Sequence, residues 1–169
     1  ANEHLLSEKY EKSLLSFVLL EEVKTNPIER LNFTLDVSNS PLQFSGIIME
    51  TGAMYVAKSK DEAKPMLMIF SLPFPTEKEE QEQMAVRKVK PITKENIKIK
   101  SIKPIEINGL KGYEVVGYEK DGKINMLIYA VMLFDEETTY TLRATALKKH
   151  KDNLAAFRKV VKTFKLKNK

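Results

Sequence analysis

Two histidines, no cysteine and a scattered set of carboxylates are the side chains that could do chemistry in this 169-residue sequence. A nucleophile–histidine relay needs a base within hydrogen-bond reach of the nucleophile. His4 lies close to the N-terminus, and His150 lies within the lysine-rich run 148–151, whose positive charge disfavours the imidazolium. The sequence has no G-x-S-x-G pattern. We therefore expect two solvent-exposed histidines and no catalytic residue.

Metal and cofactor sites are not predicted either. Two isolated histidines without any cysteine do not make a zinc ligand set. The acidic run 135–137 lacks the spaced ligands and central glycine of a calcium loop, and it indicates a solvated turn. The glutamates between residues 77 and 82 suit the start of a helix, where the dipole favours acidic side chains. Neither glycine-rich phosphate-binding pattern occurs, so we expect no bound cofactor.

Positive charge is concentrated in two segments of a chain whose net charge is +5. Residues 86–104 carry 7 basic residues and 1 acidic residue, and residues 143–169 carry 10 and 1. The clustering indicates either a surface for an anionic partner or two solvated faces. Nucleic acid is not expected, because residues 86–104 contain no aromatic side chain to stack on bases. The possible anionic-partner patch consists of Lys90, Lys94, Lys98, Lys100, Lys148, Lys149, Lys151, Arg158, Lys159 and Lys162.

The helices and strands that position these side chains are harder to assign in the first half of the chain than in the second. Residues 5–23 have an apolar stripe at helical spacing, although part of the stretch also alternates as a strand does. We expect a helical extension over 1–26 that packs on one domain spanning 1–169. Alternation over 31–37 predicts a half-buried strand, and residues 47–58 predict a strand or bent hairpin around Gly52. The apolar run 66–70 predicts a strand buried on both faces.

Helix signals and turn signals are clearer from residue 76 onward. Thr76 and Glu79 have the spacing of a capping box, which predicts a helix from residue 77 to about residue 89. Asn108-Gly109 and Asp121-Gly122 are pairs that favour tight hairpin turns. Around them, four alternating or apolar runs between residues 96 and 146 predict an antiparallel meander of four strands. In the first of these runs four isoleucines lie at the odd-numbered positions 97, 99, 105 and 107. A closing helix, capped at 152 or 153, has an apolar stripe of Leu154, Phe157, Val161 and Phe164.

The meander and its closing helix resemble the PsbP-like superfamily, which includes the photosystem protein PsbP, a Ran-binding nuclear transport factor and bacterial envelope lipoproteins. The resemblance covers residues 105–166, and it is carried by the runs NGLKGYE at 108–114 and YTLRA at 140–144, the Asp121-Gly122 turn and the Thr163-Phe164 helix end. It implies an α+β fold in which a central antiparallel sheet of about six strands has helices on both faces, as an αβα sandwich. It transfers no catalytic residue to this sequence. The sequence departs from the pattern because it has no tryptophan and no clear counterpart for 5–23.

We expect a non-enzymatic binding or accessory protein of the cell envelope whose partner is an unidentified protein or an anionic surface. The alternatives are a hydrolase that uses scattered carboxylates, for example a glycosidase, and a structural subunit that packs on a partner. No apolar run reaches the roughly 20 residues that a membrane-spanning helix needs. The sequence begins at Ala1 rather than at methionine, which fits a secreted or lipid-anchored precursor and also fits a trimmed chain. We expect a cell-envelope or secreted location, with a cytoplasmic location as the alternative.

Overall fold

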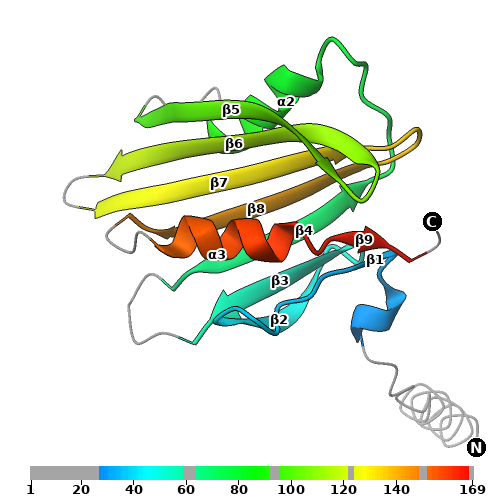
Figure 1. The fold of residues 1–169 in the computed structure, drawn as a ribbon, viewed down its shortest axis with the longest axis horizontal. Helices are drawn as coiled ribbons and strands as arrows, with labels where there is room; N and C mark the ends of the chain where they lie inside the picture. Colours follow the sequence, from blue (N-terminus) through cyan, green and yellow to red (C-terminus); the bar gives the residue numbers. More distant parts are fainter. Residues whose placement is uncertain (1–26, 59–63, 92–95, 122–123, 149–151, 168–169) are drawn as a thin grey trace, which may run out of the picture. The chain divides into compact units, whose positions relative to one another are not determined.

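The computed structural model describes residues 27–58, 64–91, 96–121, 124–148 and 152–167 (Figure 1). The chain divides into two units, Ala1–Arg30 and Leu31–Lys169. The described part of the first unit is the 3-10 helix η1 (Pro27–Arg30). The predicted helix at 5–23, both histidines and the turn glycine Gly122 lie outside the described residues.

Seven strands form one antiparallel sheet in the second unit, in the order β2-β3-β4-β8-β7-β6-β5 (Figure 1). They are β2 (Leu42–Ile48), β3 (Gly52–Ala57), β4 (Met66–Leu72), β5 (Ile97–Ile107), β6 (Leu110–Asp121), β7 (Ile124–Phe134) and β8 (Thr139–Leu147). A separate two-stranded sheet pairs β1 (Phe33–Thr34) with β9 (Lys165–Leu166). The predicted meander is therefore confirmed as β5 to β8. The tight turn predicted at Asn108-Gly109 joins β5 to β6, with a φ of 84° at Gly109.

The inner strand β7 contributes to two hydrophobic cores, because its successive side chains point to opposite faces of the sheet. Tyr129, Val131 and Leu133 face α3 (Asp152–Val161), in a core that includes Phe157 and Phe164. Ile128, Ala130 and Met132 face α2 (Gln81–Val89) in the other core. Figure 1 shows α3 in front of the sheet and α2 behind it. We call these two sides the α3 face and the α2 face.

The predicted αβα sandwich of about six strands is wrong. Strands make up 53% of the structure, the main sheet has seven of them, and its described helices are only α2 and α3. A helix of 9 or 10 residues is about 15 Å long. Seven strands spaced by about 4.8 Å extend over about 29 Å, so one such helix cannot form a layer across a face. Accordingly, α2 packs on β5, β6 and β7, and α3 packs on β7 and β8.

Two local predictions also need correction. The capping box does not form, because α2 begins at Gln81 and the Thr76 hydroxyl lies 2.9 Å from that of Thr139 instead. The predicted strand at 31–37 shortens to β1, because its partner β9 offers only two residues of pairing. The hairpin predicted around Gly52 is present as β2 and β3, with its turn before that glycine, at Met49 and Glu50.

The strand predicted at 66–70 is β4, but it is not buried on both faces. Leu67 and Ile69 are buried on the α3 face, whereas Met66, Met68 and Phe70 are only half-buried on the α2 face. The alternating pattern of burial arises because α2 lies over β5 to β7 and does not extend across β4.

Candidate functional site

The two cationic segments meet at the ring of Tyr118 on β6. The Lys100 ammonium lies 5.6 Å from the ring centroid, and the Lys148 ammonium lies 4.6 Å from it. Lys98 is the cross-strand partner of Tyr118, and paired residues of an antiparallel sheet point to the same face. These four residues define the Tyr118 cationic surface, which lies on the α3 face because Tyr118 packs against the core on that side.

A β-bulge positions the two lysines of β5. The pairing of β5 with β6 shifts between Ile99 and Ser101, so that Lys100 is the extra residue of β5. Four isoleucines of β5, at positions 97, 99, 105 and 107, are odd-numbered, so a regular strand would place these four on one face of the sheet. The one-residue shift moves the two that follow Lys100 to the other face. Ile97 lies in the core of the α2 face and Ile107 in the core of the α3 face. An alternation count along β5 could not detect this reversal.

Lys148 reaches the same ring from the end of β8. Its backbone N–H donates a hydrogen bond of 2.8 Å to the carbonyl of Asn125, which extends the pairing of β8 with β7 by one residue. This extension keeps Lys148 in register with the sheet and directs its side chain across β7 toward β6. Two lysines separated by 47 intervening residues in the sequence therefore approach one aromatic face.

The charges of this surface are exposed and uncompensated within the described part of the chain. Lys98, Lys100 and Lys148 are all solvent-exposed, and no described carboxylate forms an ion pair with them. The ammonium groups of Lys100 and Lys148 lie within about 10 Å of each other, because both lie close to one ring, and this separation equals about one Debye length at 0.1 M salt. Their potentials therefore add, and the ring stabilises both cations through its quadrupole.

The other residues of the predicted patch do not all join this surface. Lys159 and Lys162 are exposed on α3, whereas Lys90 follows the last residue of α2, which packs on the opposite face. Lys94, Lys149 and Lys151 lie outside the described residues. Arg158 is engaged elsewhere, since its guanidinium forms an ion pair with Glu114.

Glu114 is a buried carboxylate that the sequence analysis did not single out. It is 7% exposed on the α3 face of β6, where it accepts hydrogen bonds from Nε and Nη2 of Arg158 on α3. The hydroxyl of Tyr129 on β7 donates a third hydrogen bond to Glu114 at 3.2 Å. Both carboxylate oxygens are therefore occupied, and the cluster fastens α3 to the sheet. The sequence signal for this site was a glutamate at a core-facing position of β6. Its partner Arg158 could not be identified from the sequence, because it lies 44 residues away.

Titration of this cluster is shifted in the direction that keeps its hydrogen bonds intact. Burial, followed by the charge of Glu114, raises the pKa of the Tyr129 hydroxyl far above its usual value, so the hydroxyl remains a donor. The hydrogen bonds to Glu114 raise the pKa of the Arg158 guanidinium, which remains charged. Tyr129 thus stays a hydrogen-bond donor and Arg158 a cation, both directed at Glu114.

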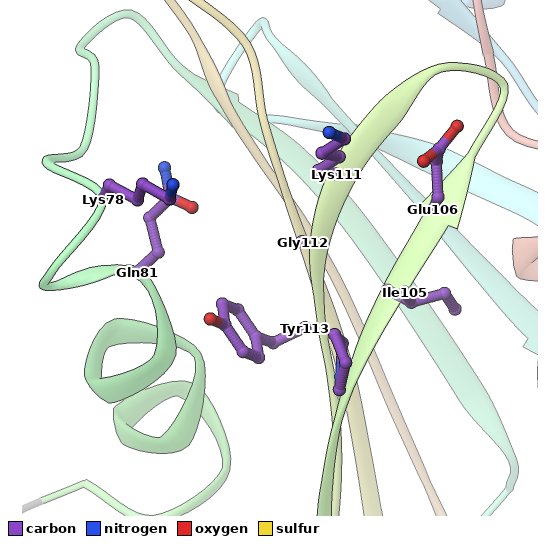
Figure 2. A pocket seen from close by; sticks show the side chains of 8 residues that line it. Lys78, Gln81, Ile105, Glu106, Lys111, Gly112 and Tyr113 are labelled. Atoms are coloured by element: carbon purple, nitrogen blue, oxygen red, sulfur yellow. The ribbon is translucent and has the colours of Figure 1, made fainter.

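A separate hollow of about 400 Å³ lies on the α2 side of the β5–β6 hairpin. Figure 2 shows Tyr113 projecting from β6 toward the start of α2, where Gln81 and Lys78 lie across from it. The Gln81 amide donates a hydrogen bond of 3.1 Å to the carbonyl of Thr76, which fixes that side. The described side chains that line the hollow include Lys78, Lys111 and Glu106 but no histidine or hydroxyl nucleophile other than Tyr113.

Among the described residues, no group of three or more histidine or acidic side chains is placed to hold a metal ion. No helix within the described ranges is long and apolar enough to cross a bilayer.

The comparisons with known proteins rest on structure alone. No family model and no curated protein matches the sequence. LpqN, a protein involved in cell envelope biogenesis of Mycobacterium tuberculosis, has a similar structure with a TM-score of 0.63 and 12% identity over 77% of this chain and 79% of its own. A Bacteroides thetaiotaomicron protein is similar at a TM-score of 0.52 and 9% identity, over 82% of this chain and 46% of its own.

A protein of unknown function from Pseudomonas aeruginosa, PA94, described as a putative regulator, is also similar. Its TM-score is 0.51 at 9% identity, over 73% of this chain and 96% of its own. At such low identities the likeness shows a shared fold. The chain therefore has a fold related to that of an envelope protein, and its resemblance to the PsbP-like superfamily stays a prediction.

Proposed function

We propose that this chain is a non-enzymatic binding or accessory protein of the cell envelope that binds an anionic membrane surface through the Tyr118 cationic surface. The observation that carries the proposal is the approach of Lys100 and Lys148 to one ring. They belong to the two segments in which the sequence concentrates its positive charge. The envelope role is supported by the fold shared with LpqN, which is itself involved in cell envelope biogenesis.

The chemistry of the surface favours a broad, charged partner over a small ligand. Its lysines are exposed and lie on a sheet, so they are accessible to a flat surface. Each lysine close to an anionic leaflet contributes about 1 kcal/mol of attraction. Several lysines are therefore needed for measurable binding, and Lys98, Lys100 and Lys148 supply three on one face.

The test is sedimentation of the protein with vesicles of neutral lipid and with vesicles that contain an anionic lipid. We expect binding to the anionic vesicles only. Lys100→Ala with Lys148→Ala should weaken binding about thirtyfold, since the two losses together amount to about 2 kcal/mol. The matched control is Lys58→Ala with Lys64→Ala, which removes two exposed lysines that flank β3 and β4.

Two outcomes contradict the proposal. The first is a lack of binding to anionic vesicles at low salt by the unchanged protein. The second is an equal loss of binding in the two double variants, because it would show that net charge and not the Tyr118 cationic surface is responsible.

A further inference from the structure

The α2 face of the sheet carries a row of apolar side chains on β3 and β4. They are the even-numbered residues Met54, Val56, Met66, Met68, Phe70 and Leu72, which define the methionine surface. Met54 pairs with Met68 and Val56 pairs with Met66 across the two strands. All six are half-buried, and none belongs to either hydrophobic core.

Of the described elements, α2 reaches this surface at one edge, where the Lys88 side chain lies over the Phe70 ring. The helix on this side of the sheet, α2, packs on β5, β6 and β7. The exposed side of an antiparallel sheet is ordinarily polar, with apolar residues directed to the core. Here the exposed side of β3 and β4 is as apolar as the buried side, where Tyr55, Leu67 and Ile69 lie. A contiguous apolar surface that is only partly covered is a candidate interaction site.

Only positive charges border the methionine surface on the sheet. The strands β2, β3, β4 and β8 contain no aspartate or glutamate, and their one charged residue is Arg143, the cross-strand partner of Met68. Arg143 Nε donates a hydrogen bond of 3.1 Å to the carbonyl of Lys88 on α2. The Lys88 ammonium lies 5.5 Å from the centroid of the Phe70 ring. Glu119 on β6 already interacts electrostatically with Arg143, so a partner that covers this surface would bring its negative charges chiefly to Lys88.

The dimensions of the surface fit one helix. A helix with its side chains is about 10 Å wide, which is the width of two strands spaced by about 4.8 Å. The seven residues of β4 extend over about 23 Å, which corresponds to a helix of about 15 residues. Methionine side chains are flexible and polarisable, and they adapt to the apolar face of a helix.

We propose that the methionine surface docks an amphipathic helix of a partner protein, with acidic residues along the flank that meets Lys88. The surface lies on the opposite side of the sheet from the Tyr118 cationic surface, so this proposal does not rest on the proposed function. One side of the sheet would serve an anionic surface and the other a protein.

The test uses two synthetic amphipathic helices of about 15 residues with the same leucine face. One has glutamates along one flank, and the other has lysines in the same positions. The protein is labelled at its methionine methyl groups and titrated with each peptide. We expect the glutamate peptide to shift the signals of Met54, Met66 and Met68 but not that of Met132, which is fully buried in the other core of the α2 face. The lysine peptide should bind at least about tenfold more weakly.

Two variants make the test specific. Met68→Glu should abolish binding of the glutamate peptide, whereas the matched control Ile47→Glu, which alters an exposed apolar residue paired with Ala53 on the α3 face, should not. Lys88→Glu should reverse the preference in favour of the lysine peptide. An unchanged Met132 signal verifies that each variant is folded.

Several outcomes would overturn the proposal. Equal binding of the two peptides, or insensitivity of binding to Met68→Glu, would remove the basis for an acidic helix. The same methyl shifts could also appear without any peptide. If they appeared on raising the protein concentration alone, the surface would bind a second copy of the protein; if they appeared on adding vesicles, it would bind a membrane. If they appeared on removing residues 1–26, the surface would be covered by the chain itself.

Discussion

Arg158 and Glu114 join α3 to β6 through two parallel hydrogen bonds, in which the guanidinium donates from Nε and Nη2 to the two carboxylate oxygens. The environment of the pair is asymmetric, because the side chain of Arg158 is 39% exposed and that of Glu114 is 8% exposed. The cost of breaking the pair should therefore depend on which partner is removed.

Arg158→Met should destabilise the protein by about 2 to 3 kcal/mol, because among the described side chains it leaves only the Tyr129 hydroxyl hydrogen-bonded to the buried charge of Glu114. Glu114→Gln should cost about 1 kcal/mol, since Arg158 can turn to solvent. Urea unfolding of both variants and of the double variant measures the difference. Equal losses in the two single variants would mean that the burial of Glu114 does not govern the energy of the pair.

Phe157 anchors the centre of α3. Its ring is 2% exposed and stacks on Tyr129 with centroids 6.3 Å apart and an interplanar angle of 9°. Phe157→Ala should destabilise the protein by about 3 to 5 kcal/mol, because it removes a large buried ring and leaves a cavity. The exposed Lys159 on the same helix provides the control, and Lys159→Ala should change the free energy of unfolding by less than about 0.5 kcal/mol. Thermal melts that fail to separate these two variants would refute the packing of α3.

Gly112 allows β6 and β7 to approach closely. A Cβ on Gly112 would lie 1.8 Å from the carbonyl oxygen of Met132, and this backbone atom cannot move away as the end of a side chain can. Gly112→Ala should therefore cost about 3 kcal/mol or more, at the upper end of overpacking effects. Gly46→Ala is the matched control, because no atom lies within 4 Å of its added Cβ, and its cost should stay below about 0.5 kcal/mol. Chemical denaturation of the two variants would contradict this explanation if Gly112→Ala were tolerated as well as Gly46→Ala.

Binding through the Tyr118 cationic surface should depend on salt. The Debye length falls from about 30 Å at 0.01 M salt to about 8 Å at 0.15 M, so the attraction of exposed lysines to an anionic vesicle weakens over this range. We expect the fraction of protein that sediments with anionic vesicles to decrease steadily with salt, while its melting temperature stays nearly constant because exposed charges contribute little to folding. Salt-independent sedimentation would indicate an apolar mode of attachment.

The sequence by itself determined the meander. Asn108 and Gly109 adopt the positive φ angles of 48° and 84° that a tight hairpin requires, and such a requirement is local to two residues. The apolar runs of β7 and the stripe of α3 were equally predictable, because the periods of burial, two for a strand and 3.6 for a helix, are properties of the local backbone. The concentration of lysines in two segments was also visible in the sequence.

Only the tertiary structure decided how these parts combine. The bulge at Lys100 reverses the facing of β5, and the pairing of Glu114 with Arg158 joins residues 44 positions apart. The limited coverage of the α2 face, which leaves Met68 half-buried, follows from the position of a short helix on a wide sheet. Each of these features depends on contacts between segments distant in the chain. Local periodicity carries no information about such contacts, and so the meeting of Lys100 with Lys148 at Tyr118 could be seen only in the folded protein.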